Sequence, residues 1–446
     1  NLKIMKKNRL MNNPKKKVAY VGLSADILHE GHINILKKAK TLGSVIVGLL
    51  SDKAISTYKK LPLLNYKQRE IVLKNIKYVK QVIPQDSLDY TKNLNRIKPD
   101  YVVHGDDWKK GIQAKTRAKV IKTLKKWSGK LIEPKYTKNI SSTLIKKNLA
   151  QLNPTPQNRI SNLKKLMSSK DIVRILESHS SLTGLIIENL VINKKNINLQ
   201  FDAMWSSSLT DSAIRGKPDN SSVDFSTRIS SLNDMMEVTT KPVVFDADNG
   251  GRIEHLPFLV RSLERLGVSA MVIEDKIGLK KNSLFKNQDD AQQDSPSKFS
   301  QKIKKIVKSR KSNDFLVIAR IESFILNKGL KDALNRAETY SKSGADAILI
   351  HSKENTTKEI FSFSRIFQKS KYYIPLVSVP STYSKVYEKQ LFKNGFKIVI
   401  YANQLLRAAY PAIEYAAKNI LENGRAFDLE KKIIPIKKII NLIKND

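Results

Sequence analysis

Two histidines near the start of the chain have a spacing that suits phosphate chemistry. His29 and His32 are three residues apart, with Gly31 between them. They follow the apolar stretch Lys17–Leu23, which we interpret as a buried strand, and a helix is expected from about His32 to Leu42. The free N–H groups and the dipole of a helix N-terminus favour phosphate. Two imidazoles aimed at that point would stabilise a pentacoordinate phosphorus without forming a covalent bond to it. The alternative is that either histidine has only a structural role.

A second group of polar residues lies further along the chain, where apolar runs repeatedly end in charged side chains. The ionisable residues at these ends are Asp246, Asp248, Glu274, Asp275, Arg320, Glu322 and His351. If the runs are strands of a (β/α)8 barrel, these residues share the end of the barrel that carries chemistry in that fold. Ordinary polarity at strand ends is the alternative, but so many ionisable groups favour an active site.

Strands that alternate with helices must position the two histidines. The stretches Ser44–Leu50, Tyr101–Val103 and Lys130–Glu133 are predicted as further strands, and Ile71–Val79 has helical spacing. This alternation is typical of a parallel α/β sheet. The pattern ends near Leu149.

A polar segment with two prolines, residues 150–160, is the best linker candidate. We expect a basic N-terminal tail over 1–16, a first domain over 17–149, the linker over 150–160 and a barrel over 161–446. The barrel is predicted from eight apolar runs, at residues 172–180, 199–205, 243–248, 270–276, 315–322, 347–352, 375–380 and 398–403. Helical patterns lie between them, as a (β/α)8 barrel requires.

The composition limits the class of protein and the class of site. The chain of 446 residues is long enough for roughly two or three domains. Hydrophobic residues make up 41% of it, enough to form buried cores. No cysteine occurs, which excludes disulfides, thiolate metal sites and a cysteine nucleophile. No apolar run approaches the roughly 18 residues that span a membrane, and Asn1–Lys17 lacks the apolar stretch of a secretory signal. We therefore expect a cytoplasmic protein with no membrane partner.

The excess of positive charge has three explanations. There are 81 Lys or Arg against 41 Asp or Glu, a formal net charge of +40. Such a charge would suit nucleic acid or anionic membranes, would attract small anionic substrates, or would reflect a composition rich in Lys, Asn and Ile. Because lysines occur along the whole chain, we favour the compositional explanation and do not expect nucleic acid as a partner.

Residues 17–146 resemble the cytidylyltransferases of the nucleotidyltransferase superfamily. The resemblance rests on His29 and His32, the helix ILKKAKTLG, YKQRE around Arg69, GDDW (105–108) and ISST (140–143). It implies a Rossmann-like nucleotidyltransferase domain that transfers CMP from CTP to a phosphonate acceptor. The implied nucleotide-binding residues are Asp26, His29, His32, Lys59, Lys60, Arg69, Asp106, Ser141, Ser142 and Thr143. The family usually has an Arg at the position of Tyr136, so a nucleotide-binding module without activity is the alternative.

Residues 158–439 resemble phosphoenolpyruvate mutase, of the isocitrate lyase superfamily. The resemblance rests on DADNG (246–250), EDKIGLKKNSLF (274–285), VIARIESF (317–324) and ILIHSK (348–353). It implies an α/β chain in which a helix-swapped (β/α)8 barrel follows the Rossmann-like domain. It also implies a homo-oligomer, a dimer or tetramer, formed through the swapped helices. The implied reaction moves a phosphoryl group from the enol oxygen of phosphoenolpyruvate to carbon, which gives phosphonopyruvate.

The same resemblance implies roles for individual side chains. An enolate needs a Lewis acid, which Mg²⁺ would supply. Asp246 would bind the ion directly, and Asp248 and Glu274 would bind the water molecules coordinated to the ion. The implied catalytic residues are Asp219, Lys280, Asn282, Ser283, Arg320 and His351. Arg320 and His351 would bind the phosphoryl group, and Asn282 would guide it. Lys280 and Ser283 would help to close a lid over the site. Asp219 would assist at the metal. The implied pyruvate pocket is lined by Trp205, Ser207, Ser208 and Leu209.

Two positions depart from the family pattern. Ser208 stands where a Gly is frequent, and Asp211 where a small or apolar residue is commoner, so both would alter the fit of the substrate. Phosphonopyruvate hydrolase, which shares the metal and phosphoryl groups, is the closest rival; Asn282 and Ser283 on the lid favour the mutase. Together the two resemblances imply a bifunctional enzyme of phosphonate biosynthesis.

Overall fold

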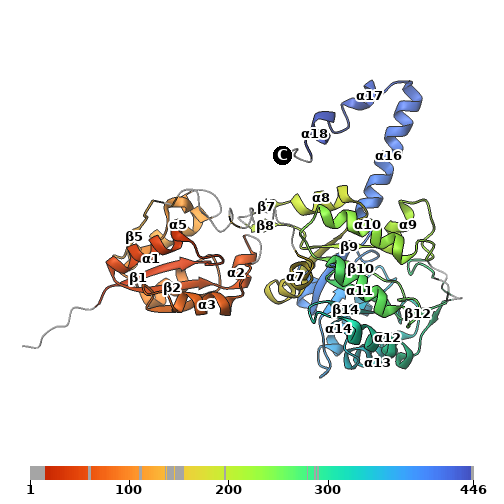
Figure 1. Cartoon of the computed structure of the whole chain (residues 1–446), viewed down its shortest axis with the longest axis horizontal. Coiled ribbons are helices and arrows are strands. Elements are labelled where there is room, and N and C mark those ends of the chain that lie inside the picture. Colours follow the sequence, from red (N-terminus) through yellow and green to blue (C-terminus); the bar gives the residue numbers. More distant parts are fainter. Residues whose placement is uncertain are drawn as a thin grey trace, which may run out of the picture. The chain divides into compact units, whose positions relative to one another are not determined.

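A computed structural model of the chain describes residues 16–58, 62–109, 113–135, 137, 145, 155–194, 197–278, 280–285, 288 and 291–442. The chain forms two compact units. One comprises Asn1–Asn153 and Val191–Leu199, and the other comprises Pro154–Leu190 and Gln200–Asp446. Figure 1 shows a sheet with flanking helices in the first unit and a barrel in the second.

The first unit is a parallel α/β fold. Its sheet has the order β3-β2-β1-β4-β5 and consists of β1 (Val18–Leu23), β2 (Ser44–Leu50), β3 (Gln81–Gln85), β4 (Tyr101–Val103) and β5 (Lys130–Ile132). Its helices are α1 (Glu30–Leu42), α2 (Asp52–Ser56), α3 (Tyr66–Lys74), α4 (Thr91–Ile97), α5 (Ala114–Leu124) and the short 3-10 helices η1 (Asp106–Lys109) and η3 (Lys125–Trp127). The antiparallel pair β7 (Ile192–Lys194) and β8 (Ile197–Leu199) also belongs to this unit.

The predicted parallel sheet is confirmed, with differences at three elements. Helix α1 begins at Glu30, two residues earlier than expected. The stretch Ile71–Val79 is not one helix: α3 runs from Tyr66 to Lys74, because Asn65 and Gln68 cap its start by reciprocal side-chain to main-chain hydrogen bonds of 3.0 Å. The sequence does not predict β3, whose short QVIPQ segment contains a proline.

The second unit is a closed parallel barrel, as predicted. Its strands are β6 (Val173–Glu177), β9 (Ala203–Ser206), β10 (Val243–Asp246), β11 (Ala270–Glu274), β14 (Leu316–Ile321), β15 (Ala347–Ile350), β16 (Leu376–Ser378) and β17 (Phe396–Tyr401). Its helices are α7 (Pro156–Ser169), α8 (Ser181–Asn189), α9 (Ser208–Ala213), α10 (Phe225–Glu237), α11 (Leu256–Leu266), α12 (Pro296–Ser309), α13 (Gly329–Lys342), α14 (Lys358–Phe367), α15 (Glu388–Lys393), α16 (Gln404–Asn423), α17 (Phe427–Glu430) and α18 (Ile436–Ile440). A short antiparallel ribbon of β12 (Lys276–Ile277) and β13 (Gln292–Gln293) follows β11.

The barrel strands are apolar on both faces because both faces are covered. Along β10, Val244 belongs to the cluster inside the barrel, and its neighbour Phe245 belongs to the layer between strands and helices. Leu163 of α7 joins the interior cluster. Helix α7 begins at Pro156, inside the stretch expected as a linker, because Thr155 caps it and a proline suits the first helical turn.

Helix α16 extends away from the barrel (Figure 1). None of its residues is buried, although it carries large apolar side chains. Tyr410, Ile413 and Leu421 are 67%, 68% and 85% exposed. Across the described part of the chain, no helix is both long and apolar enough to cross a membrane.

Candidate functional site

A cavity lies at the carboxyl ends of the barrel strands. It brings together the barrel residues for which the sequence predicts a catalytic, metal-binding or pocket-lining role. These residues are Trp205, Ser207, Ser208, Leu209, Asp219, Asp246, Asp248, Glu274, Lys280, Asn282, Ser283, Arg320 and His351. Their individual roles remain predictions.

Parallel strand pairing gathers these side chains at one end of the barrel. Asp246 is the last residue of β10 and Glu274 the last residue of β11. Glu274 lies in register with Arg320 on β14, and His351 directly follows β15. Residues far apart in the sequence therefore meet because each occupies the same place on its own strand.

Carboxylates surround the ammonium of Lys280 on one side of the cavity. Its Nζ is 2.6 Å from Asp248 Oδ1 and 2.5 Å from Asp219 Oδ1, and it donates to Ser208 Oγ at 2.5 Å. Ser208 Oγ in turn donates to Asp246 Oδ2 at 2.9 Å. The hydroxyl of Ser208 therefore links the lid lysine to the carboxylate at the end of β10.

The carboxylates on this side differ in how readily they ionise. Burial opposes ionisation of Asp246, but Lys280 and Arg228 outweigh burial and lower the pKa of this carboxyl. Burial and the nearby charge of Asp246 raise the pKa of Asp248, and burial raises the pKa of Glu274 to about 7. A divalent cation would favour the ionised form of all three groups.

The donor set fits a hydrated magnesium ion. Mg²⁺ prefers oxygen ligands and keeps several of its waters in most protein sites. Among the residues that the structure describes, no three His, Asp or Glu side chains converge into a complete metal-binding cluster. Asp246, Asp248 and Glu274 nevertheless all line the cavity, and each offers only the oxygen ligands that this ion prefers.

Arg320 is the main cation on the opposite side of the cavity. Its Nε donates to Glu322 Oε1 at 2.6 Å, and its Nη2 donates to Ser283 Oγ at 2.8 Å. Burial opposes its charge, but Glu322 and Glu274 outweigh burial and raise the pKa of Arg320. The guanidinium is therefore a fixed cation with a fixed direction.

His351 is a neutral neighbour of this guanidinium. Burial and the charge of Arg320 lower the pKa of His351. Arg320 Nη2 lies 3.1 Å from His351 Nδ1, while Glu322 Oε1 lies 3.3 Å from the same atom. Nδ1 therefore lies between a group that only donates and a carboxylate that only accepts, and the ring's tautomer decides which of the two contacts is a hydrogen bond.

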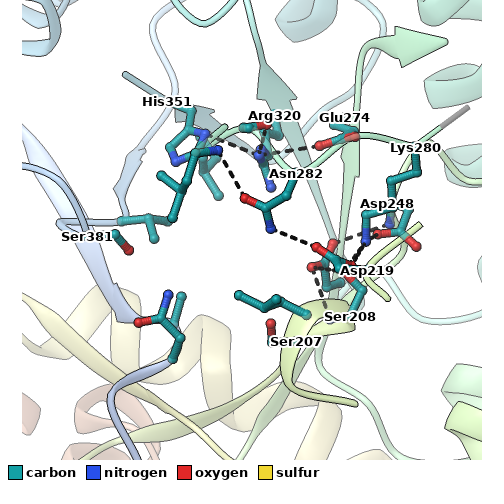
Figure 2. Close-up of a pocket in the computed structure, with 18 of the residues that line it drawn as sticks. Ser207, Ser208, Asp219, Asp248, Glu274, Lys280, Asn282, Arg320, His351 and Ser381 are labelled. Carbon is teal, nitrogen blue, oxygen red and sulfur yellow. Dashed lines mark hydrogen bonds and ion pairs between the residues drawn. The ribbon is translucent and has the colours of Figure 1, made fainter. Parts of the chain in front are cut away.

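Asn282 lies between the two sides (Figure 2). Its Nδ2 donates to Asp219 Oδ2 at 2.7 Å, and its Oδ1 accepts from the N–H of Leu284 at 3.0 Å. Gln288 donates to its main-chain oxygen at 2.9 Å. The amide is therefore held at a defined orientation over the cavity.

The sequence gives no role to Lys276, which anchors the segment that carries Asn282. This lysine is 5% exposed and donates from Nζ to Ser283 Oγ at 2.9 Å and to the carbonyl oxygen of Lys281 at 2.6 Å. Its ammonium also lies 3.6 Å from Glu322 Oε2. Lys276 belongs to the EDK string, but only the fold shows which residues it contacts.

Three further residues differ from the sequence-based expectation. Ser381 and Asn403 line the cavity although no role was predicted for them; the polar endings of the last two barrel runs were their only signal. Asp211 does not line the cavity, so an effect of this residue on substrate fit would be indirect and stays a prediction. Its carboxylate instead pairs with Arg228 Nε at 2.9 Å.

The first unit places its histidines at the switch point of the sheet. The chain runs from β1 to β2 and β3 on one side and returns to β4 and β5 on the other, and ligands bind outside the carboxyl ends of such strands. His29 and His32 follow β1, with ring centroids 4.0 Å apart, and Asp106 follows β4. Asp26, 2% exposed, accepts from the N–H of Leu63 at 2.6 Å.

Arg69 is engaged by the chain itself. It is 1% exposed, and its guanidinium donates to the main-chain oxygens of Leu64 and Ser24 and to Asp52 Oδ1, at 3.1, 2.5 and 2.6 Å. It therefore supports the loop after β1, and its role near a nucleotide stays a prediction. The other predicted nucleotide-binding residues, Lys59, Lys60, Ser141, Ser142 and Thr143, lie outside the described residues, as does Tyr136.

Family comparisons match both parts of the chain. Residues 163–421 match the family described as phosphoenolpyruvate phosphomutase. Residues 20–148 match the family described as cytidylyltransferase-like.

Individual relatives agree with the first match. Phosphoenolpyruvate phosphomutase of Tetrahymena pyriformis is 33% identical over 291 residues, 65% of this chain and 92% of that protein. A crystal structure of phosphoenolpyruvate phosphomutase from Streptomyces platensis subsp. rosaceus has a TM-score of 0.58 at 32% identity, over 64% of this chain and 94% of that one. A crystal structure of phosphonopyruvate hydrolase in complex with oxalate and Mg²⁺ has a TM-score of 0.56 at 27% identity, over 65% and 95%. The chain therefore belongs to the phosphoenolpyruvate phosphomutase family and carries a cytidylyltransferase-like domain ahead of its barrel.

Proposed function

We propose that the barrel interconverts phosphoenolpyruvate and 3-phosphonopyruvate. The bond between phosphorus and the enol oxygen breaks, and a bond between phosphorus and C3 of the same pyruvate forms, so no atom enters or leaves. The observation that carries the proposal is one cavity lined both by the carboxylates Asp246, Asp248 and Glu274 and by the guanidinium of Arg320. The reaction needs both, because it must hold an enolate and a phosphoryl group at once.

The carboxylates would hold the enolate through a metal ion. Asp246 would bind Mg²⁺ directly, and Asp248 and Glu274 would hold its waters. When bound, the ion would supply a Lewis acid for the developing enolate charge. Main-chain N–H groups of Ser207–Leu209 would bind the pyruvate carboxylate beside Trp205.

The guanidinium would hold the phosphoryl group. Arg320 would pair with its oxygens through charge-assisted hydrogen bonds, and the imidazole of His351 would contact the same group. Asn282 would contact the group as it crosses from oxygen to carbon. Asp219, Lys280 and Ser283 would keep the lid segment closed and water out, because water in the cavity would divert the phosphoryl group to hydrolysis.

Phosphorus NMR tests this function directly. Purified protein with Mg²⁺ and phosphonopyruvate, without CTP, should replace the phosphonate resonance by the phosphate-ester resonance of phosphoenolpyruvate. An inorganic phosphate signal would instead identify a phosphonopyruvate hydrolase, the activity of one of the similar solved structures. An Asp246→Ala variant serves as the inactive control.

The first unit would transfer CMP from CTP to a phosphonate. A phosphonate oxygen would attack the α-phosphorus, and pyrophosphate would leave. The paired rings of His29 and His32 at the switch point support this proposal, because they could stabilise the charge of a pentacoordinate phosphorus. Pyrophosphate release from CTP with candidate phosphonates tests it; CTP binding without turnover would identify a nucleotide-binding module instead.

The barrel would work as a homo-oligomer. The exposed apolar side chains of α16 support this, because an unpartnered apolar surface on a projecting helix is costly in water. A second copy of the barrel would cover them, with the same helix exchanged in return.

A further inference from the structure

Arg228 lies outside the cavity, yet it contacts two of its walls. It is on α10 and is 1% exposed. Its guanidinium carbon lies 4.3 Å from the centroid of the Phe245 ring, so the cation is buried between α10 and β10. Nothing in the sequence marks this arginine, because its partners come from other elements.

Each nitrogen of the guanidinium has a different partner. Nε donates to Asp211 Oδ2 at 2.9 Å, Nη1 donates to the main-chain oxygen of Asp246 at 2.5 Å, and Nη2 donates to the main-chain oxygen of Ser206 at 3.3 Å. Ser206 and Asp211 bracket the turn that lines the substrate pocket. Arg228 therefore holds both ends of this turn and the end of β10.

The same turn is held from the cavity side by the side chain of Asp246. The N–H and Oγ of Ser208 donate to Asp246 Oδ2 at 3.3 and 2.9 Å. Asp246 is thus fixed through its carbonyl by Arg228 and through its carboxylate by the turn. Arg228, the turn and Asp246 are therefore joined to one another pairwise by hydrogen bonds.

We infer that Arg228 is a positioning residue that fixes the substrate turn and the metal-binding carboxylate of Asp246 relative to each other. This inference rests on the proposed metal-dependent site. A buried ion pair can be replaced by apolar residues of similar volume without loss of the fold, so stability alone does not explain the pair of Arg228 and Asp211. Its specific contribution is the pair of hydrogen bonds to the main chain of both walls.

The decisive variant removes both charges together. Asp211→Leu/Arg228→Met leaves the net charge unchanged, and Asp248, which lies 4.0 Å from Arg228, keeps its closer ion pair with Lys280 at 2.6 Å. We expect Mg²⁺ binding, measured by calorimetry without substrate, to weaken by about 10-fold, and KM for phosphonopyruvate to rise by a similar factor, as is usual when a partner that orients a metal ligand is lost. Circular dichroism and thermal unfolding establish that the variant is folded.

Arg159→Met is the matched control. Arg159 is also buried, at 4% exposed, and its Nη2 donates to the main-chain oxygens of Met236 and Thr239, but it does not line the cavity. This variant should unfold at a lower temperature and keep the parental Mg²⁺ affinity and KM. An equal loss of Mg²⁺ affinity in Arg159→Met would overturn the inference, because general destabilisation would then explain both variants.

A second variant covers the case in which the double variant does not fold. Arg228→Lys keeps the charge, but one ammonium cannot reproduce the planar fork that reaches Asp211, Asp246 and Ser206 together. It should also weaken Mg²⁺ binding. A folded variant of either kind with the parental Mg²⁺ affinity and KM would overturn the inference. A parent that binds Mg²⁺ but does not convert phosphonopyruvate would refute the isomerase and leave the inference intact.

Discussion

At the scale of single residues, Arg320 holds its charge in one direction through a planar fork of donors. Its guanidinium donates at once to Glu322 and to Ser283, and this fork fixes the direction of the charge. Arg320→Lys keeps the charge and loses the fork. We expect kcat for isomerisation to fall by about 100-fold, the usual effect of losing one preorganised donor, with a melting temperature close to that of the parent.

Phosphorus NMR and thermal unfolding measure the two quantities. Arg365→Lys is the matched control, because Arg365 is exposed on α14, and it should change neither. A parental kcat in Arg320→Lys would show that the cavity needs only positive charge at this position.

Glu133 in the first unit links the stability of that unit to pH. Arg117 donates to both of its carboxylate oxygens, at 2.8 and 2.9 Å, and Trp108 Nε1 donates to Oε1 at 2.7 Å. The hydrogen bond from Arg117, helped by Trp108 and opposed by burial, lowers the pKa of Glu133 to about 2. Because the folded-state pKa lies below the ordinary value of 4.5, this carboxylate stabilises the folded unit above that pH. The stabilisation is lost as the pH falls toward 2.

Glu133→Gln should therefore destabilise the first unit at neutral pH and much less in acid. Urea unfolding, monitored by tryptophan fluorescence at about pH 7 and about pH 3, gives the free energy of unfolding of the variant and of the parent at each pH. The difference between the two proteins is then compared between the two pH values. Glu70→Gln is the control, because its partner Lys74 is exposed and such pairs contribute little. A difference that does not change with pH would contradict the assignment.

At the scale of elements, α16 carries the clearest prediction. Its apolar side chains, among them Ile413 at 68% exposed, have no partner within the described part of the chain that buries them. If a second copy covers them, Ile413→Asp places a charge in an apolar interface, which costs several kcal/mol. We expect sedimentation to show a mass of two or more chains for the parent and of one chain for this variant.

Glu422→Lys is the control for this measurement. It changes the charge near the end of the same helix without removing an apolar side chain, and it should keep the parental mass. A monomeric parent would contradict the prediction.

Helices and strands with a clear pattern of apolar residues were predictable from the sequence, and the contacts between them were not. The eight apolar runs of the barrel predicted its eight strands, because strands covered on both faces need continuous apolar sequence. The strand β3, with Pro84 inside it, has no such pattern. In the site, residues at strand ends such as Asp246 were predictable from position, whereas Lys276 and Arg228 have partners on other elements that no local pattern reveals.

At the scale of the whole molecule, the two units have separate cores. The cluster that includes Val21, Val47 and Leu73 fills the first unit, and the cluster that includes Phe245, Val317 and Ile348 fills the second. The barrel cavity is lined only by residues of the second unit. Each unit thus has the means to hold its own candidate site.

This separation predicts that the two activities can be removed one at a time. Asp246→Ala removes the expected metal ligand and should reduce conversion of phosphonopyruvate below detection, while CTP-dependent pyrophosphate release stays at the parental rate. His32→Ala removes an imidazole from the switch point of the first unit and should have the opposite effect. Phosphorus NMR follows both reactions in the same sample, and thermal unfolding checks that each variant is folded. If either substitution in a folded protein removed both activities, the two sites would have to depend on each other, because each altered side chain lies in a unit with its own core.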